Sequence, residues 1–253
     1  MIANFRSWST PWIRLFSLAV FIAIWQVAAL IADSDILPGP LPVLLSLLGH
    51  LQQGDLLYDL ASTLLRVLIS FILAMALGVA LGVVMGREKH WDAALDGMLI
   101  FTLNLPALVT IILCYLWFGL GEFAAILAVA INKFPVVVVN MREGARAVDQ
   151  NLLQVAKAFR LDWRSSLFRV YLPQLYPYLL ASARSGLSLV WKIVLVVELL
   201  GRSNGVGFKL GVFFQFFDIT SILAYSFAFI AVVMTIEYLL IAPLDRHLMK
   251  WRA

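Results

Sequence analysis

The chain has 253 residues, of which 62% are hydrophobic and 13% are charged, and its mean hydropathy is +0.93. One core of this size cannot hide so much apolar surface, so the composition excludes an ordinary globular protein and indicates a membrane protein. The single cysteine, Cys114, and three widely separated histidines exclude a disulfide framework and a metal site built from clustered thiolate or imidazole ligands.

Six apolar stretches approach the roughly 20 helical residues needed to cross a bilayer core of about 30 Å. In chain order they are Leu15 to Ala32, Val67 to Gly86, Met98 to Phe118, Phe123 to Met141, Tyr178 to Leu200 and Ile222 to Ile241. The first could be a secretory signal peptide, but its apolar run is long and no clear A-x-A site ends it. The sequence therefore predicts an all-α membrane protein with six transmembrane helices, forming a single domain over residues 1–253.

The segment between the first two spans, residues 33–63, holds four aspartates and no lysine or arginine. Its stretch "LPGPLPVLLSLL" places three prolines before an apolar run that is too short to cross a membrane. We expect an extended piece and then a helix at the outer surface, because a proline disfavours helix in the residue before it. A packed interfacial loop is the plainer alternative.

The second span carries a stripe of small residues at every fourth position. Its members are Ser70, Ala74, Gly78, Gly82 and Gly86. A stripe of this kind on one helix face lets a neighbouring helix approach closely. We interpret it as a packing surface, although it could also line a passage.

The third and fourth spans are interrupted by prolines, in "NLP" (residues 104–106) and "NKFP" (residues 132–135). Proline removes a helical hydrogen bond and frees a carbonyl, so we expect both helices to kink at these points.

Two lysines lie deep in the predicted spans, Lys133 in the fourth and Lys192 in the fifth. A buried ammonium group is costly unless it pairs, snorkels or faces water, so both lysines are candidates for contact with an anion. The alternatives are pairing with Glu198 or Glu237, or snorkelling of Lys133. No relay of acidic residues crosses the spans.

The loop Gly201 to Thr220 combines a flexible turn, "GRSNGVGF", with the aromatic stretch "VFFQFFDI". We expect it to form part of an outer gate or a docking surface, and a simple interfacial anchor is the alternative.

Basic residues are distributed unevenly over the loops. Thirteen lysines and arginines lie on the side of the two termini and two lie on the other side. By the positive-inside rule, both termini are predicted to be cytoplasmic. The pI near 9.3 therefore reflects membrane topology and does not indicate binding to nucleic acid.

The cytoplasmic segment 142–174 is long and patterned. Helical spacing of apolar residues, with Asp149 as N-cap, predicts one short amphipathic helix, and Asp162 can cap a second. A basic turn from Arg160 to Arg164 separates them, and Pro173 and Pro177 are expected to break the chain before the fifth span.

This segment resembles the cytoplasmic signature of ABC importer permeases, which reads E-A-A, three residues, G, nine residues, I-x-L-P. The signature falls on Gln154, Val155, Ala156, Arg160, Val170, Leu172 and Pro173. Its spacing is kept, while its glutamate, first alanine and glycine are replaced. In order along the chain, "LPGP", "STLLRVLISF", "LWFGLGE", "EGARAVDQNLLQVAKAF", "VYLPQLYPYLLASARSGLSLVW", "VVELLG" and "GVGF" resemble the taurine, sulfonate and nitrate branch of these permeases.

The resemblance implies a type I ABC importer permease fold in the bacterial inner membrane. It also implies a second permease copy, forming a homodimer, two ATP-binding subunits and an extracytoplasmic binding protein that delivers a small anion or organic solute. ATP and magnesium would be bound by the partner subunits, since the chain has no GxxxxGK[ST] phosphate loop and no cofactor of its own. An ion-coupled secondary transporter or channel and a membrane-embedded enzyme are the alternatives.

Two groups of site residues are predicted, the first from the resemblance together with the pattern of the segment and the second from the polar residues within the spans. The coupling surface for the ATPase comprises Gln154, Val155, Ala156, Phe159, Arg160, Leu161, Asp162, Trp163, Arg164, Leu172 and Pro173. The candidate residues of a translocation path are Asn104, Lys133, Lys192 and Glu198.

Overall fold

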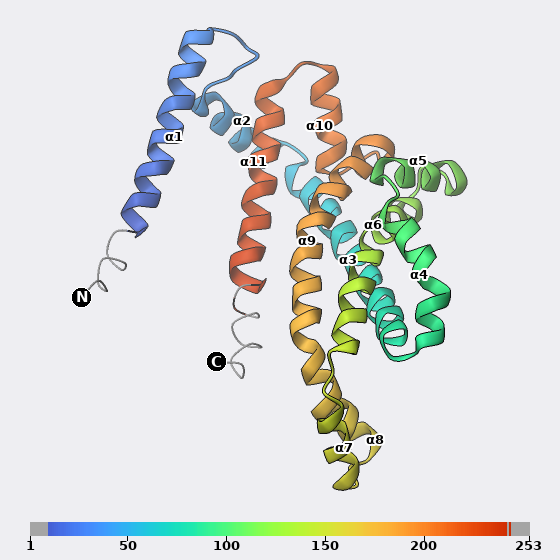
Figure 1. Cartoon of the computed structure of the whole chain (residues 1–253). Coiled ribbons are helices and arrows are strands. Elements are labelled where there is room, and N and C mark those ends of the chain that lie inside the picture. The colour runs from blue at the N-terminus through green and yellow to red at the C-terminus, as the bar shows by residue number, and fades with distance from the viewer. Residues whose placement is uncertain (1–9, 242, 244–253) are drawn as a thin grey trace, which may run out of the picture.

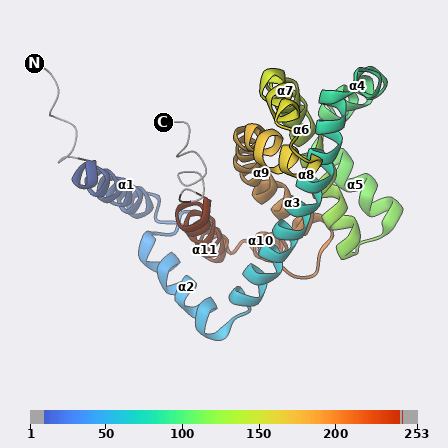
Figure 2. The same cartoon turned by 90° about the horizontal axis from the view of Figure 1, so that it is seen from below.

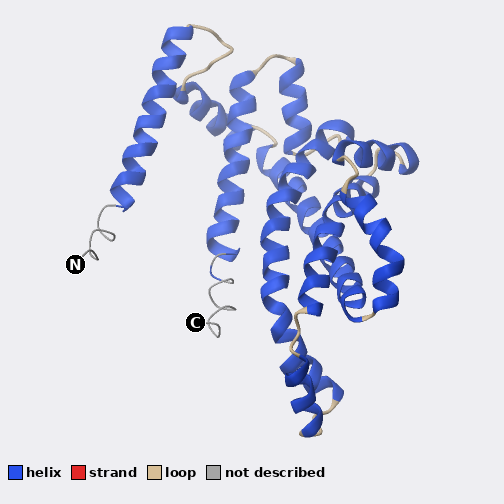
Figure 3. Ribbon diagram, in the orientation of Figure 1, coloured by secondary structure: helices blue, strands red, loops and turns tan. Residues whose placement is uncertain are grey.

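The computed structural model of the chain describes residues 10–241 and residue 243, and every regular element in this part is a helix (Figure 1, Figure 3). The first half contains α1 (Thr10–Ala32), α2 (Pro40–Gln53), α3 (Leu56–Arg87), α4 (Lys89–Leu103), α5 (Ala107–Phe118) and α6 (Glu122–Arg146). The second half contains α7 (Gln150–Ala158), α8 (Trp163–Ser166), the π-helical turn η1 (Leu167–Tyr171), α9 (Leu172–Gly201), α10 (Val206–Gln215), α11 (Ile219–Ile236) and the π-helical turn η2 (Glu237–Ile241). The predicted all-α class is confirmed.

Five helical runs are long and apolar enough to cross a membrane, and they correspond to five of the six predicted spans. They are Leu15–Ala32, Leu56–Arg87, Glu122–Arg146, Trp163–Gly201 and Ile219–Leu239. The sixth crossing exists if the bent pair formed by α4 and α5 counts as one span.

The predicted third span is sharply broken. α4 and α5 meet at an angle of 98°, and the break is the "NLP" stretch. The peptide N–H of Asn104 bonds the carbonyl of Ile100 at 3.3 Å and ends α4, and Pro106 then stands as the N-cap of α5. The expected kink is confirmed here, because Pro106 has no N–H with which to continue α4. At "NKFP" the chain is not interrupted, and α6 runs through Pro135 as one α-helix.

The loops gather at two ends of the molecule (Figure 1). The connections from α1 to α2 and from α10 to α11 lie at one end, and α7 and α8 lie at the other. α1 begins and α11 ends toward the side of α7 and α8, as the predicted alternation of spans requires. The basic residues Arg6, Arg246, Lys250 and Arg252, which contribute to the charge bias, lie outside the described residues.

α1 lies at the edge of the molecule (Figure 2), and no residue of its 18-residue apolar window is fully buried, although the Trp25 ring lies 5.6 Å from that of Phe227 in α11. A hydrogen bond of 3.0 Å from the indole N–H of Trp25 to the carbonyl of Pro38 ties α1 to the segment before α2. The helix predicted after this segment is confirmed as α2, but residues 33–37 form turns and bends, so the prediction of an extended piece was wrong for most of the segment.

The small-residue stripe of α3 packs against α6. A β-carbon placed on Gly78 would lie 2.6 Å from Cβ of Val137, and one on Gly82 would lie 2.6 Å from the carbonyl oxygen of Val138. Ser70, Ala74, Gly78 and Gly82 are buried inside the subunit. The stripe is therefore a packing surface and does not line a passage between these two helices.

We expect Gly82→Ala to destabilise the protein by about 1–3 kcal/mol, the usual cost of overpacking a core, because the added methyl group meets α6 backbone. Gly97→Ala in α4 is the matched control, since a β-carbon there meets nothing within 4 Å and the gain in helix propensity is the same. Thermal unfolding in detergent measures the difference. Equal transition temperatures for the two variants would contradict the packing interpretation.

Candidate functional site

The segment between α6 and α9 forms two capped helices, as predicted. The carboxylate of Asp149 accepts a hydrogen bond of 2.7 Å from the N–H of Asn151 at the start of α7. Asp162 accepts one of 3.3 Å from the N–H of Ser165 at the start of α8, and the hydrogen bonds from Ser165 lower the pKa of Asp162. Both aspartates thus satisfy orphan N–H groups at a helix start.

α7 ends in a left-handed turn centred on Arg160, which has a φ of +54°. Its N–H donates to the carbonyl of Lys157 at 2.9 Å, and the N–H of Leu161 donates to the carbonyl of Ala156 at 3.0 Å. These two bonds define a Schellman motif, in which the left-handed residue is usually glycine. The left-handed conformation costs a residue with a side chain about 1–2 kcal/mol. The arginine therefore occupies the position where the family signature has glycine, and the turn forms nevertheless.

The two prolines do not break the chain before α9, and this prediction was wrong. α8 passes through η1 directly into α9, and the N–H of Leu172 donates to the carbonyl of Leu167, five residues earlier. Pro173 is the second residue of α9, and the helical path continues through it although it has no N–H to donate. Pro177 lies inside α9 without ending it.

The predicted coupling residues form one surface at the far end of the molecule (Figure 1). Phe159 and Trp163 are 78% and 69% exposed, and the guanidinium of Arg164 lies 5.7 Å from the Trp163 ring centroid. Beside them is an open groove of about 520 Å³. It is lined by Leu152, Val155, Ala156, Phe159, Leu161, Arg169, Val170, Pro173 and Gln174. Ala156 is buried, while Gln154 and Val155 are exposed and Leu172 is partly buried.

The four candidate path residues are not brought together. Asn104 is exposed and its side-chain amide donates to the carbonyl of Ile100 at 2.8 Å, closing α4. Lys133 and Glu198 are fully buried, and Lys192 is exposed. They therefore do not form a single site within the described subunit.

Lys133 is enclosed between α6 and α9. Its ammonium donates to the backbone carbonyl of Ser182 at 2.9 Å, and no carboxylate of the described residues pairs with it. A β-carbon on Gly186 would lie 1.8 Å from Cε of Lys133, so the glycine provides the space that the lysine fills.

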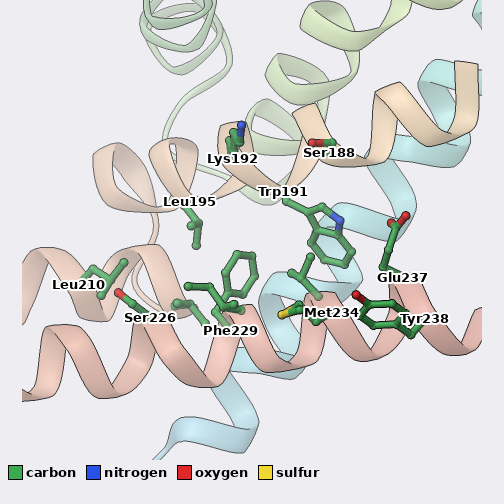
Figure 4. A pocket seen from close by; sticks show the side chains of 13 residues that line it. Ser188, Trp191, Lys192, Leu195, Leu210, Ser226, Phe229, Met234, Glu237 and Tyr238 are labelled. Atoms are coloured by element: carbon green, nitrogen blue, oxygen red, sulfur yellow. The ribbon is translucent and has the colours of Figure 1, made fainter. Parts of the chain in front are cut away.

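Lys192 borders a groove of about 510 Å³ between α9, α10 and α11 (Figure 4). The floor is mostly apolar and includes Trp191 and Phe229, whose rings meet edge to face at 5.9 Å. The Lys192 side chain stands on α9 at the rim, and Glu237 stands at another edge. The groove thus combines apolar walls with one cation and one anion.

An ionic cluster around the buried pair Arg66 and Glu198 was not predicted from the sequence. Arg66 of α3 donates to Glu198 of α9 at 2.6 Å and to Glu122 of α6 at 2.7 Å, and it also bonds the side chain of Asn204. Thr63 donates to Glu198 at 2.9 Å. Glu198 therefore pairs with Arg66, and neither deep lysine pairs with it. The signal in the sequence was the presence of opposite charges at the ends of three different spans.

The same cluster holds the turn between α9 and α10. The N–H of Gly205, whose φ is +104°, donates to Asp59 at 2.8 Å, and the N–H of Gly207 donates to Glu198 at 2.9 Å. Since a side chain at Gly205 would collide with the Glu198 carboxylate, the turn is built for glycine.

The aromatic stretch after this turn is helical up to Gln215 and then forms the connection to α11. Phe216 and Phe217 are 77% and 79% exposed there, and Asp218 caps α11 by accepting from the N–H of Ser221 at 3.0 Å.

Comparison with known proteins assigns the chain to a family. The model of the family described as "binding-protein-dependent transport system inner membrane component" matches residues 74–248. The chain belongs to this family of transport permeases.

Relatives of the permease include ABC transporter permeases with different named solutes. SsuC of Bacillus subtilis, provisionally named an aliphatic sulfonates transport permease protein, is 32% identical over 236 residues, covering 92% of this chain and 85% of SsuC. The taurine transport system permease protein TauC of Escherichia coli is 28% identical, covering 93% and 88%. The nitrate import permease protein NrtB of Synechococcus elongatus is 27% identical, covering 76% and 72%.

Proposed function

We propose that this permease is the membrane-spanning subunit of an ATP-driven importer for a small anion or organic solute of the sulfonate, taurine or nitrate kind. An extracytoplasmic binding protein delivers the solute, and two ATP-binding subunits supply the energy. The permease acts as a homodimer and performs no covalent chemistry, with residues 1–253 forming one domain. ATP and magnesium belong to the ATPase, because this chain has no phosphate-binding loop.

The observation that carries the proposal is the exposed surface of α7 and α8. Phe159 and Trp163 present apolar area beside Arg160 and Arg164, at the end of the molecule where α7 and α8 lie. Exposed aromatic residues next to arginines are typical of protein interfaces. Segment 142–174 is accordingly the coupling loop, which docks on the ATPase and passes its closing motion to the spans.

The proposed orientation places both termini and the coupling loop in the cytoplasm. In a variant with Cys114→Ser, a cysteine introduced at Leu45 should react with an impermeant maleimide in intact cells. A cysteine introduced at Lys157 should react only after permeabilisation. Labelling of both positions from the same side would contradict this topology.

Reconstitution separates the importer from its rival, an ion-coupled carrier or channel. We expect proteoliposomes to take up ethanesulfonate, taurine or nitrate only when the ATPase, ATP and the binding protein are all present. Uptake by the permease alone, driven by an ion gradient, would support the rival instead.

Lys192 is proposed to contact the anion from the rim of the groove between α9 and α11. Lys192→Met keeps most of the apolar stem and removes the charge, so we expect uptake to fall about tenfold, the effect of losing one charge-assisted contact. Lys133 is enclosed and acts on passage indirectly, so Lys133→Met should have a smaller effect. Lys89→Met at the start of α4 is the control. Unchanged uptake in Lys192→Met, in a complex that assembles fully, would make this lysine merely structural.

A further inference from the structure

Arg160 is the residue of the coupling loop that the fold of this chain explains least. The Schellman motif needs only the backbone of residue 160, and its left-handed conformation favours glycine. The guanidinium is exposed and makes no hydrogen bond or ion pair with the described residues. An arginine therefore strains the turn, and its guanidinium gains neither a hydrogen bond nor an ion pair from the described residues.

The surroundings of Arg160 are basic and lack a free acid. Lys157, Arg164 and Arg169 are exposed on the same helix pair, and none of them has a carboxylate partner in the described part of the chain. The carboxylate of Asp162 is engaged as a helix cap. This surface is complementary to a partner that brings its own carboxylates.

Next to these cations lies the open groove, with Val155, Phe159 and Leu161 among its apolar walls. A pocket of this size accepts a side chain that projects from a partner. An anionic membrane surface would satisfy the cations, but the flat layer of lipid headgroups would not fill a concave, mostly apolar groove.

We propose that the ATP-binding subunit seats a protruding apolar side chain in this groove and places a carboxylate on Arg160. The strained arginine then determines which ATPase the permease accepts. This inference rests on the proposed function. It adds the chemistry of the ATPase surface and names Arg160 as the residue that recognises it.

The test compares Arg160→Gln with Arg160→Gly in the full permease in nanodiscs. Both variants remove the positive charge, but only Arg160→Gly also relieves the strain of the left-handed backbone at this position. We expect the affinity for the ATPase to fall about tenfold in both, as for the loss of a charge-assisted hydrogen bond, and its dependence on salt to weaken. Thermal unfolding should show Arg160→Gly to be at least as stable as the wild type.

Three outcomes would overturn the inference. In the first, the Arg160→Gln variant keeps full affinity for the ATPase while the Phe159→Ala/Trp163→Ala variant loses binding. The coupling surface would then be supported, and Arg160 would have no part in it. Affinity lost in Arg160→Gln and retained in Arg160→Gly would assign the effect to the backbone. A loss confined to nanodiscs with anionic lipid would assign the guanidinium to lipid headgroups. If neither the arginine variants nor the double aromatic variant changes ATPase binding, the proposed function itself fails.

Discussion

Arg66→Met is expected to lower the free energy of unfolding by about 3–5 kcal/mol, because it leaves Glu198 as a buried charge without its partner. The side chains of Arg66 and Glu198 are 4% and 0% exposed, and they are joined at 2.6 Å. Asn204 would also lose its contact with Arg66, so the turn between α9 and α10 should loosen.

Chemical unfolding in detergent measures this loss, and two further variants interpret it. Lys209→Met breaks an ion pair with Asp55, which is 70% exposed, so it should cost less than about 1 kcal/mol. Arg66→Met combined with Glu198→Gln removes the orphaned charge and should recover at least half of the stability. A double variant as unstable as Arg66→Met would mean that the buried carboxylate is not the cause.

Phe159→Ala combined with Trp163→Ala is expected to uncouple ATP hydrolysis from transport or to release the ATPase. Truncating one aromatic hot spot costs about 2 kcal/mol or more, which corresponds to an affinity loss on the order of 30-fold for each residue. Insertion into the membrane and folding should persist, because both side chains are largely exposed and contribute nothing to the buried core of the subunit. Co-purification with the ATPase and the ratio of uptake to ATP turnover in proteoliposomes measure the effect.

Phe216→Ala combined with Phe217→Ala provides the matched control. These aromatic residues are equally exposed and lie at the opposite end of the molecule (Figure 1). Their replacement should leave ATPase binding unchanged. The Phe159→Ala/Trp163→Ala variant could instead show full ATPase binding and an unchanged ratio of transport to hydrolysis. That result would contradict a coupling role for this loop.

The spans were predictable from the sequence because each is a long apolar run, and Asp149 and Asp162 were predictable as caps because capping is local. The continuation of α9 through Pro173 and Pro177 was not predictable. The expectation that proline breaks a helix takes no account of the π-helical turn that precedes these two residues.

The ionic cluster was beyond sequence reasoning for a different reason. Arg66 and Glu198 are 132 positions apart, and only the packing of α3, α6 and α9 brings them together. The candidate path residues show the opposite case. Lys133 and Lys192 both lie deep within predicted spans, but the structure encloses the first and exposes the second.

The uninterrupted passage from α8 through η1 into α9 has a mechanical consequence. α9 has 30 residues and is therefore about 45 Å long. Under the proposed function, α9 would act as a lever arm whose base follows the basic turn and whose far end carries Glu198. By simple trigonometry over that length, a tilt of about 10° at the base displaces the far tip by about 8 Å. If the ATPase tilts this base as proposed, the largest displacement falls at the ionic cluster of Arg66 and Glu198, on the opposite side of the membrane.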